Sequence, residues 1–141
     1  MTYFDANIFV FAACDQTEIG SNARVLINDI QEGRRTVSTS ALTYDEVVWG
    51  VRKSLGKEAA DRAGELFLAL PHLQLIEVKR ETITEAHHLV KHFNLKPRDA
   101  IHFATMRLER ETEIVSEDPD FDALPGIKRI ALREVNFPRK D

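Results

Sequence analysis

Four acidic residues that lie far apart in the chain have side chains suited to a metal site: Asp5, Glu46, Asp99 and Asp118. Carboxylates gathered in one place repel each other and raise one another's pKa values unless a cation lies among them. Oxygen ligands of this kind suit Mg²⁺ or Mn²⁺. If the fold brings the four acids together, they predict a metal-dependent phosphodiesterase.

Short apolar segments alternate along the chain with segments of helical periodicity. Strands are expected at residues 2–4, 35–37, 73–78, 113–115 and 128–130. Helices are expected at residues 8–14, 22–31, 57–70, 81–93 and 98–109, with a further helix that ends near Leu55 and has Ser38, Thr39 and Ser40 as candidate N-caps. This alternation predicts an α/β fold, a three-layer α/β/α sandwich with a mainly parallel central sheet.

The expected elements place the acids where such folds bind ligands, at the carboxyl ends of the strands. Asp5 follows the first expected strand, and Asp118 follows the fourth. Asp99 lies in the first turn of a helix, and Glu46 lies in the second turn of another. An alternative role for Asp5 is that of an ordinary helix cap. A cap does not account for Asn7, whose amide could orient a ligand or a water beside Asp5.

Glu46 and its neighbour Asp45 compete for the role of ligand. The two lie about 100° apart on a helix, so they face different surroundings. Asp45 is expected to face Arg52 as an exposed pair. Glu46 shares its face with the apolar Leu42 and Trp49, and a carboxylate on such a face needs a partner. Glu46 is therefore the better candidate.

The neighbours of Asp99 favour a functional role over simple compensation of the helix dipole. Arg98 adjoins it, and His102 follows one turn later on the same face. Arg98 is expected either to contact phosphate or to pair with a carboxylate elsewhere. A histidine such as His102 is more often a polar helix residue than a catalytic one. The remaining histidines have no metal-ligand spacing and are expected at the surface: His72, His87, His88 and His92.

Three aspartates crowd the segment after the fourth expected strand. Asp118 is nearest to the strand and is the first choice as a ligand, with Asp120 in reserve. Asp122 is expected to cap a short helical turn. Ser116 could add a hydroxyl to the same site.

Composition limits the class of protein. The chain has 141 residues, of which 43% are hydrophobic and 30% charged, as expected for a single globular domain over residues 1–141. No apolar stretch is long enough for a membrane span, and the lone Cys14 fits the reducing cytoplasm.

The net charge of −4 argues against binding nucleic acid by overall electrostatics. Most basic clusters are expected to be solvated surface, with phosphate contact as the alternative: Arg34-Arg35, Arg52-Lys53 and Arg139-Lys140.

The chain resembles PIN-domain ribonucleases, in particular the toxins of VapBC-type toxin–antitoxin pairs. The resemblance runs from residue 3 to about residue 130. It rests on residues 3–8, 40–46, 97–102 and 114–121, which follow the order of the family's motifs. Each motif alone is weak, but the four in order are specific. The family's acidic quartet corresponds to Asp5, Glu46, Asp99 and Asp118, and its polar residue after the fourth strand to Ser116.

The resemblance implies hydrolysis of RNA phosphodiester bonds with one or two Mg²⁺ or Mn²⁺ ions, leaving 5′-phosphate and 3′-hydroxyl ends. Asp5, Asp99 and Asp118 would be the main ligands, and Glu46 would hold a metal-bound water or a second ion. It also implies a homodimer, with Val25 or Leu66 as candidate contacts, and a small antitoxin partner that blocks the acidic cleft.

Two other classes of function are consistent with parts of the sequence. One is a catalytically silent PIN-like module that binds RNA or a protein partner, although the intact quartet argues against it. The other is a phosphotransfer protein with an aspartyl nucleophile. That second class needs another acid or a hydroxyl beside Asp5, where the chain has Ala6 and Asn7.

Overall fold

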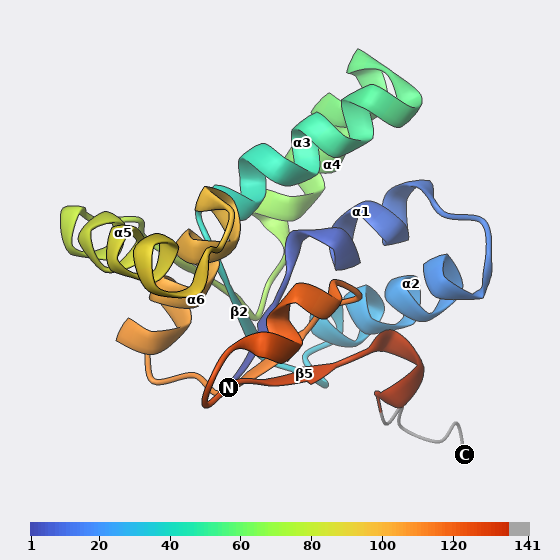
Figure 1. Ribbon diagram of the computed structural model, residues 1–141. Helices are drawn as coiled ribbons and strands as arrows, with labels where there is room; N and C mark the ends of the chain where they lie inside the picture. The colour runs from blue at the N-terminus through green and yellow to red at the C-terminus, as the bar shows by residue number, and fades with distance from the viewer. Residues whose placement is uncertain (136–141) are drawn as a thin grey trace.

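The structure, a computed structural model, describes residues 1–135 and contains a five-stranded sheet flanked by six α-helices (Figure 1). The strands are β1 (Thr2–Phe4), β2 (Val37–Ser40), β3 (Leu73–Ile76), β4 (Glu113–Val115) and β5 (Lys128–Ile130). The α-helices are α1 (Ala6–Cys14), α2 (Glu18–Gln31), α3 (Leu42–Leu55), α4 (Lys57–Ala69), α5 (Arg80–Phe93) and α6 (Pro97–Leu108). Two 3₁₀ helices follow, η1 (Pro119–Ala123) and η2 (Leu132–Glu134).

The sheet has the order β3-β2-β1-β4-β5, and every neighbouring pair is parallel. The predicted three-layer α/β fold is therefore confirmed. Since all strands run the same way, their carboxyl ends meet at one edge of the sheet. The three central strands end there in Phe4, Ser40 and Val115, and the chain leaves each of them towards a candidate site residue.

Alternating side chains divide the core between the two faces of the sheet. Phe4 and Val115 pack with α1, α2, α3 and α4 on one face. Tyr3 and Ile114 pack with α5, α6 and η1 on the other. Figure 1 shows α5 and α6 on one side of the sheet and α1 and α2 on the opposite side.

Local sequence signals account for several helix boundaries. Asp5 caps α1 by accepting a hydrogen bond from the Ala6 N–H at 2.7 Å. Gly56 ends α3 with a φ of 91°, a conformation that favours glycine. Pro97 occupies the first turn of α6, where its missing N–H costs no hydrogen bond. These signals place the acids of the candidate site at the start of helices.

The strand predicted at residues 35–37 is displaced, because β2 covers Val37–Ser40. Ser38, Thr39 and Ser40 are therefore fully buried strand residues, and Ala41 is the N-cap of α3. The Ser40 hydroxyl still contacts the start of that helix, where it accepts a hydrogen bond from the Leu42 N–H at 3.1 Å. Their polarity suggested a cap, but the fold satisfies it internally. The Ser38 hydroxyl donates to Glu111, and the Thr39 hydroxyl donates to the Phe4 carbonyl, both at 2.7 Å.

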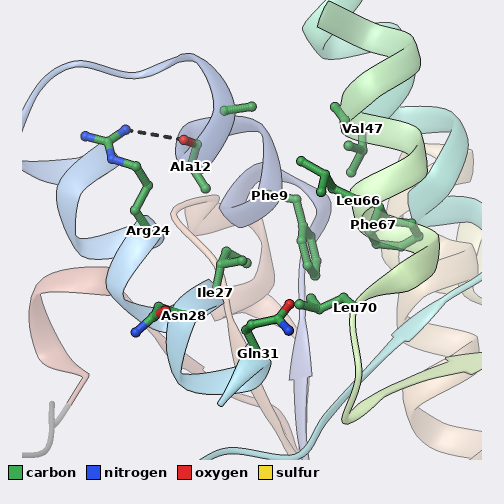
Figure 2. Close-up of a pocket in the computed structure, with 12 residues that line it drawn as sticks. Phe9, Ala12, Arg24, Ile27, Asn28, Gln31, Val47, Leu66, Phe67 and Leu70 are labelled. Carbon is green, nitrogen blue, oxygen red and sulfur yellow. Dashed lines mark hydrogen bonds between the residues drawn. The ribbon is translucent and has the colours of Figure 1, made fainter. Parts of the chain in front are cut away.

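An apolar groove of about 360 Å³ lies between α1, α2 and α4 (Figure 2). Phe9, Ile27, Leu66 and Phe67 line it. Arg24 also lines it and donates to the Ala12 carbonyl at 3.3 Å. None of the four predicted acids lines this groove, so it is separate from the site described below.

Within residues 1–135, no helix combines the length and hydrophobicity required to cross a lipid bilayer. Val25 and Leu66, the predicted dimer contacts, are both exposed, at 43% and 65%.

Candidate metal site

Three carboxylates converge at the carboxyl end of the sheet. Asp99 in the first turn of α6, Asp118 after β4 and Asp120 in η1 each have an oxygen that lies within 4.8 Å of the others. Asp99 and Asp118 are half-buried, and Asp120 is exposed. The fold thus brings together two of the four predicted acids and the reserve candidate.

Asp5 lies beside this cluster and is 93% buried (7% exposed). One carboxylate oxygen caps α1, and the other accepts a hydrogen bond from the Ser116 hydroxyl at 2.6 Å. Burial raises the pKa of Asp5, although the charge of His102 and the hydrogen bond from Ser116 act in the opposite direction. Asp5 is therefore both a helix cap and part of the acidic group.

The Ser116 hydroxyl links three parts of the site. It donates to Asp5 and accepts from the Asp118 N–H at 3.0 Å and from Asn7 Nδ2 at 3.4 Å. A hydroxyl has one donor and two acceptor positions, so Ser116 is fully used and acts as a support for Asp5. Asn7 Oδ1 is buried, and within the part of the chain that the structure describes it has no hydrogen-bond partner.

Burial and the neighbouring carboxylates together change the titration of Asp99. The pKa of Asp99 is raised to about 6, first by burial and then by the charges of Asp118, Asp5 and Asp120. The charge of His102 opposes this shift. No ion pair joins a lysine or arginine to these four aspartates anywhere in residues 1–135. The donor set therefore fits a divalent cation, which would offset the repulsion.

Glu46 is connected to the site by a hydrogen bond to His102, a pairing that the sequence did not predict. Its Oε1 lies 2.5 Å from His102 Nε2, and the other ring nitrogen, Nδ1, lies 2.5 Å from Tyr3 Oη. Burial acts to lower the pKa of His102, but the hydrogen bond and charge of Glu46, with the charges of Asp5 and Asp99, raise it overall. His102 is 1% exposed, so this polar helix residue is buried and bonded at both ring nitrogens.

The structure corrects one expected contact around the site and decides between two alternatives for another residue. Asp45 pairs with Arg98 at 3.7 Å, instead of with Arg52. This happens because the start of α6 lies near the start of α3, which brings Arg98 within reach. Of the two roles considered for Arg98, the structure shows the pairing with a carboxylate, and both side chains are more than half exposed.

Arg129 on β5 is a supporting residue that sequence reasoning missed. Its guanidinium binds both carboxylate oxygens of Asp122 at 2.8 and 2.9 Å and donates to the Ser116 carbonyl at 3.1 Å. Asp122 was predicted as a helix cap, but Asp118 caps η1 by accepting from the Asp120 N–H at 2.9 Å. Asp122 instead pairs with Arg129, and together they hold the turn that carries the aspartates. No sequence motif marks this pair.

The other predicted surface features are partly confirmed. His72, His87, His88 and His92 are exposed. The pair Arg34-Arg35 binds Asp29 and is not solvated surface only. Arg139-Lys140 lies outside the described residues.

Comparisons with known proteins agree with this geometry. The family model of the PIN domain matches residues 2–127. "VapC ribonuclease Mb1869c" of Mycobacterium bovis and "Ribonuclease VapC13" of Mycobacterium tuberculosis are each 26% identical to this chain over 132 residues, which is 93% of this chain and 100% of theirs.

Solved structures show the same fold. The toxin VapC20 of M. tuberculosis, described as cleaving the sarcin-ricin loop, has a TM-score of 0.72 at 20% identity, covering 87% of this chain and 94% of its own. DNA-bound VapBC from Salmonella typhimurium has a TM-score of 0.69 at 19% identity, covering 93% and 97%. Fold and site define an α/β protein with an acidic centre at the strand ends. The chain belongs to the PIN domain family.

Proposed function

We propose that this protein is a metal-dependent endoribonuclease and the toxin of a VapBC-type toxin–antitoxin pair. The observation that carries the proposal is the convergence of Asp99, Asp118 and Asp120 within 4.8 Å, beside the buried Asp5, at the edge where parallel sheets bind ligands. Two relatives that align over their full length are named ribonucleases, which supports RNA as the substrate. An RNA substrate also agrees with the cytoplasmic location expected from the sequence.

We assign Asp5, Asp99 and Asp118 as the ligands of Mg²⁺ or Mn²⁺, with Asp120 as a further ligand and Asn7 Oδ1 as an acceptor for a water. When bound, the ion supplies Lewis-acid stabilisation of phosphate charge and activates water. Ser116 holds Asp5 in place for this role. Glu46 keeps one oxygen on His102, so its other oxygen, Oε2, is the one that can take a proton from a water.

The test is cleavage of end-labelled RNA by the protein without its partner, in Mg²⁺, Mn²⁺ or EDTA. The RNA panel includes structured transfer and ribosomal RNA. We expect cutting that requires the metal and falls at least about 100-fold in Asp5→Asn, since it removes a proposed ligand. Asp61→Asn is the matched control: it removes the same charge from an exposed i,i+4 pair with Lys57 and should cut like wild type.

Failure to cut any RNA in this panel, by a folded protein that binds Mn²⁺, would contradict the nuclease proposal. That result would favour the silent PIN-like module instead. Cutting that persists in EDTA would contradict the metal dependence.

We also propose a small antitoxin as protein partner and a homodimer as the state in solution. Several structures with the same fold are toxin–antitoxin complexes, among them one from Klebsiella pneumoniae. The exposed Val25 and Leu66 are candidates for buried contacts in the dimer. A sedimentation experiment that finds only monomer at high concentration would exclude the dimer. Cleavage that is unchanged by the product of a neighbouring small gene would argue against that product as the antitoxin.

A further inference from the structure

We propose that His102 is a positioning residue that orients the Glu46 carboxylate at the metal site, and that Tyr3 in turn fixes the His102 ring. The proposal rests on the proposed function for the role given to Glu46. The distances that carry it are 2.5 Å from His102 Nε2 to Glu46 Oε1 and 2.5 Å from His102 Nδ1 to Tyr3 Oη.

Burial excludes a direct catalytic role for the ring. His102 is 1% exposed and Tyr3 is fully buried, so neither side chain can touch RNA. Glu46 is the member of the chain that reaches solvent, with 21% of its side chain exposed. A buried ring nitrogen without a partner is destabilising, and here both nitrogens have partners. The network therefore connects a fully buried ring to a carboxylate at the surface of the site.

One tautomer of His102 satisfies both of its hydrogen bonds and leaves a donor for Glu46. Ser40 donates its N–H to Tyr3 Oη at 3.1 Å, which leaves the phenol proton for His102 Nδ1. In that tautomer Nε2 carries the single N–H proton of the neutral ring and donates it to Glu46. Nε2 also carries a proton in the imidazolium form, so donation to Glu46 does not depend on the charge of the ring.

The network joins the elements that supply the acids. Tyr3 is on β1, two residues before Asp5, and His102 is on α6, one turn after Asp99. Tyr3 and His102 are 99 residues apart, and His102 and Glu46 are 56 apart. Glu46, on α3, is thereby held relative to both Asp5 and Asp99. Because a glutamate side chain has several rotatable bonds, fixing one oxygen restricts where the other can point.

Loss of such an outer partner typically costs 10–100-fold in metal affinity or activity. Two quantities are measured, the Mn²⁺ affinity by calorimetry and the kcat of RNA cleavage, and Glu46→Ala shows which of them depends on Glu46. We expect His102→Leu to lower that same quantity about 10–100-fold. His102→Gln retains an N–H donor at about the position of Nε2 and should recover most of the loss.

The decisive measurement is the double variant Glu46→Ala with His102→Leu. If His102 acts through Glu46, removing it in the Glu46→Ala background should cost less than about threefold further, because the two residues work as a unit. A residue that only fills space in the core would cost the same in both backgrounds. Equal costs would overturn the proposal, as would a His102→Gln variant no better than His102→Leu.

Thermal unfolding of each variant shows whether the fold is retained. If His102→Leu does not fold, Tyr3→Phe replaces it in the cycle, since it keeps the aromatic ring and removes only the hydroxyl that fixes Nδ1. We expect Tyr3→Phe to lower the same quantity as Glu46→Ala, by a smaller factor. An unchanged quantity in folded Tyr3→Phe overturns the role given to Tyr3.

The two measured quantities, Mn²⁺ affinity and RNA cleavage, allow the positioning role of His102 to be tested separately from the proposed ribonuclease activity. A wild-type protein that binds Mn²⁺ but cuts no RNA contradicts the ribonuclease, while Mn²⁺ affinity still tests the coupling of His102 to Glu46. If Glu46→Ala changes neither Mn²⁺ affinity nor cleavage in a protein that does cut RNA, Glu46 has no role at the site and the positioning proposal is wrong.

Discussion

Two buried aspartates lie at opposite ends of the parallel sheet, and their surroundings differ. Asp29, 3% exposed, is near the end of α2, before the start of β2. Its carboxylate pairs with Arg34 Nε at 2.8 Å and Arg35 Nε at 3.3 Å. Asp5, 7% exposed, follows the end of β1. The charged groups that act on it are His102, of opposite sign, and the carboxylates of Glu46 and Asp99.

This difference is the one we expect between a structural carboxylate, Asp29, and a carboxylate that we propose to bind a metal, Asp5. Burying a charge is costly unless it is paired, and Asp29 has its pairs within the fold. Its backbone carbonyl also accepts from the N–H groups of Arg34 and Arg35, at 2.8 and 3.2 Å, which closes the turn into β2. Asp5 has hydrogen bonds but also like charges, an arrangement that an added cation would stabilise. The predictions below test whether the two ends differ in this way.

The largest expected effect is metal-dependent stabilisation that requires Asp5 and not Asp29. At a Mn²⁺ concentration 100 times the dissociation constant, a ligand that binds only the native state stabilises it by about 2.7 kcal/mol. This corresponds to a rise of roughly 10 °C in the unfolding midpoint for a chain of this length. Wild type and Asp29→Asn should both show the rise, and Asp5→Asn should lose most of it. A full rise in Asp5→Asn, measured by calorimetry, would remove Asp5 from the metal site.

The second prediction concerns Asp29 alone. Asp29→Asn places an amide NH₂ against an arginine donor and should lower the free energy of unfolding by about 1–3 kcal/mol. The cost stays in this range because Arg34 and Arg35 are partly exposed, at 46% and 28%, and can regain water. Urea denaturation measures the loss, and Mn²⁺ affinity should be unchanged. Asp61→Asn, at an exposed pair, is the control and should change stability by less than about 0.5 kcal/mol.

The sequence was sufficient to predict the fold class and the positions of Asp5, Asp99 and Asp118. Each of these acids is next to a clear local signal: a short apolar strand before Asp5 and Asp118, and Pro97 before Asp99. In a parallel sheet these signals also predict where the acids meet, because strand ends converge. Asp120 was predicted only as a reserve, since its spacing from β4 does not define which way the turn points.

The supports of the site could not be predicted in the same way. Tyr3 contacts His102 across 99 residues, and Arg129 reaches Asp122 and Ser116 from β5. Such contacts depend on how strands and helices pack, and no local pattern encodes them. The serine and threonine residues of β2 misled the prediction for the opposite reason. Their type is common at helix N-caps, but long-range hydrogen bonds satisfy Ser38 and Thr39 inside a buried strand.

The third prediction is a substitution that stabilises the protein, although most substitutions destabilise. Without metal, Asp99→Asn should raise the unfolding midpoint at pH 7.5 by about 2–4 °C, near 1 kcal/mol for a chain of this size. The reason is that the substitution removes repulsion from Asp118, Asp5 and Asp120. Asp29→Asn lowers the midpoint under the same conditions. A lower midpoint in metal-free Asp99→Asn would mean that the acidic group is compensated already, as Asp29 is.

The smallest expected effect is the pH dependence of this gain. The folded-state pKa of Asp99 is about 6, above the ordinary value of 3.8. As pH falls through 6, the native state therefore takes up a proton that the unfolded state does not yet bind, and the metal-free protein gains stability from this group until pH approaches 3.8. The gain in unfolding midpoint of Asp99→Asn over wild type should accordingly be largest above pH 7 and shrink towards pH 5. The same gain should appear, with the same pH dependence, when Asp99→Asn is added to the Asp29→Asn variant, since the two ends of the sheet are independent. Thermal unfolding at pH 7.5, 6 and 5 in EDTA measures both differences. An advantage that stays constant over this range would show that Asp99 does not titrate there, and that repulsion among the acids is weaker than their positions indicate.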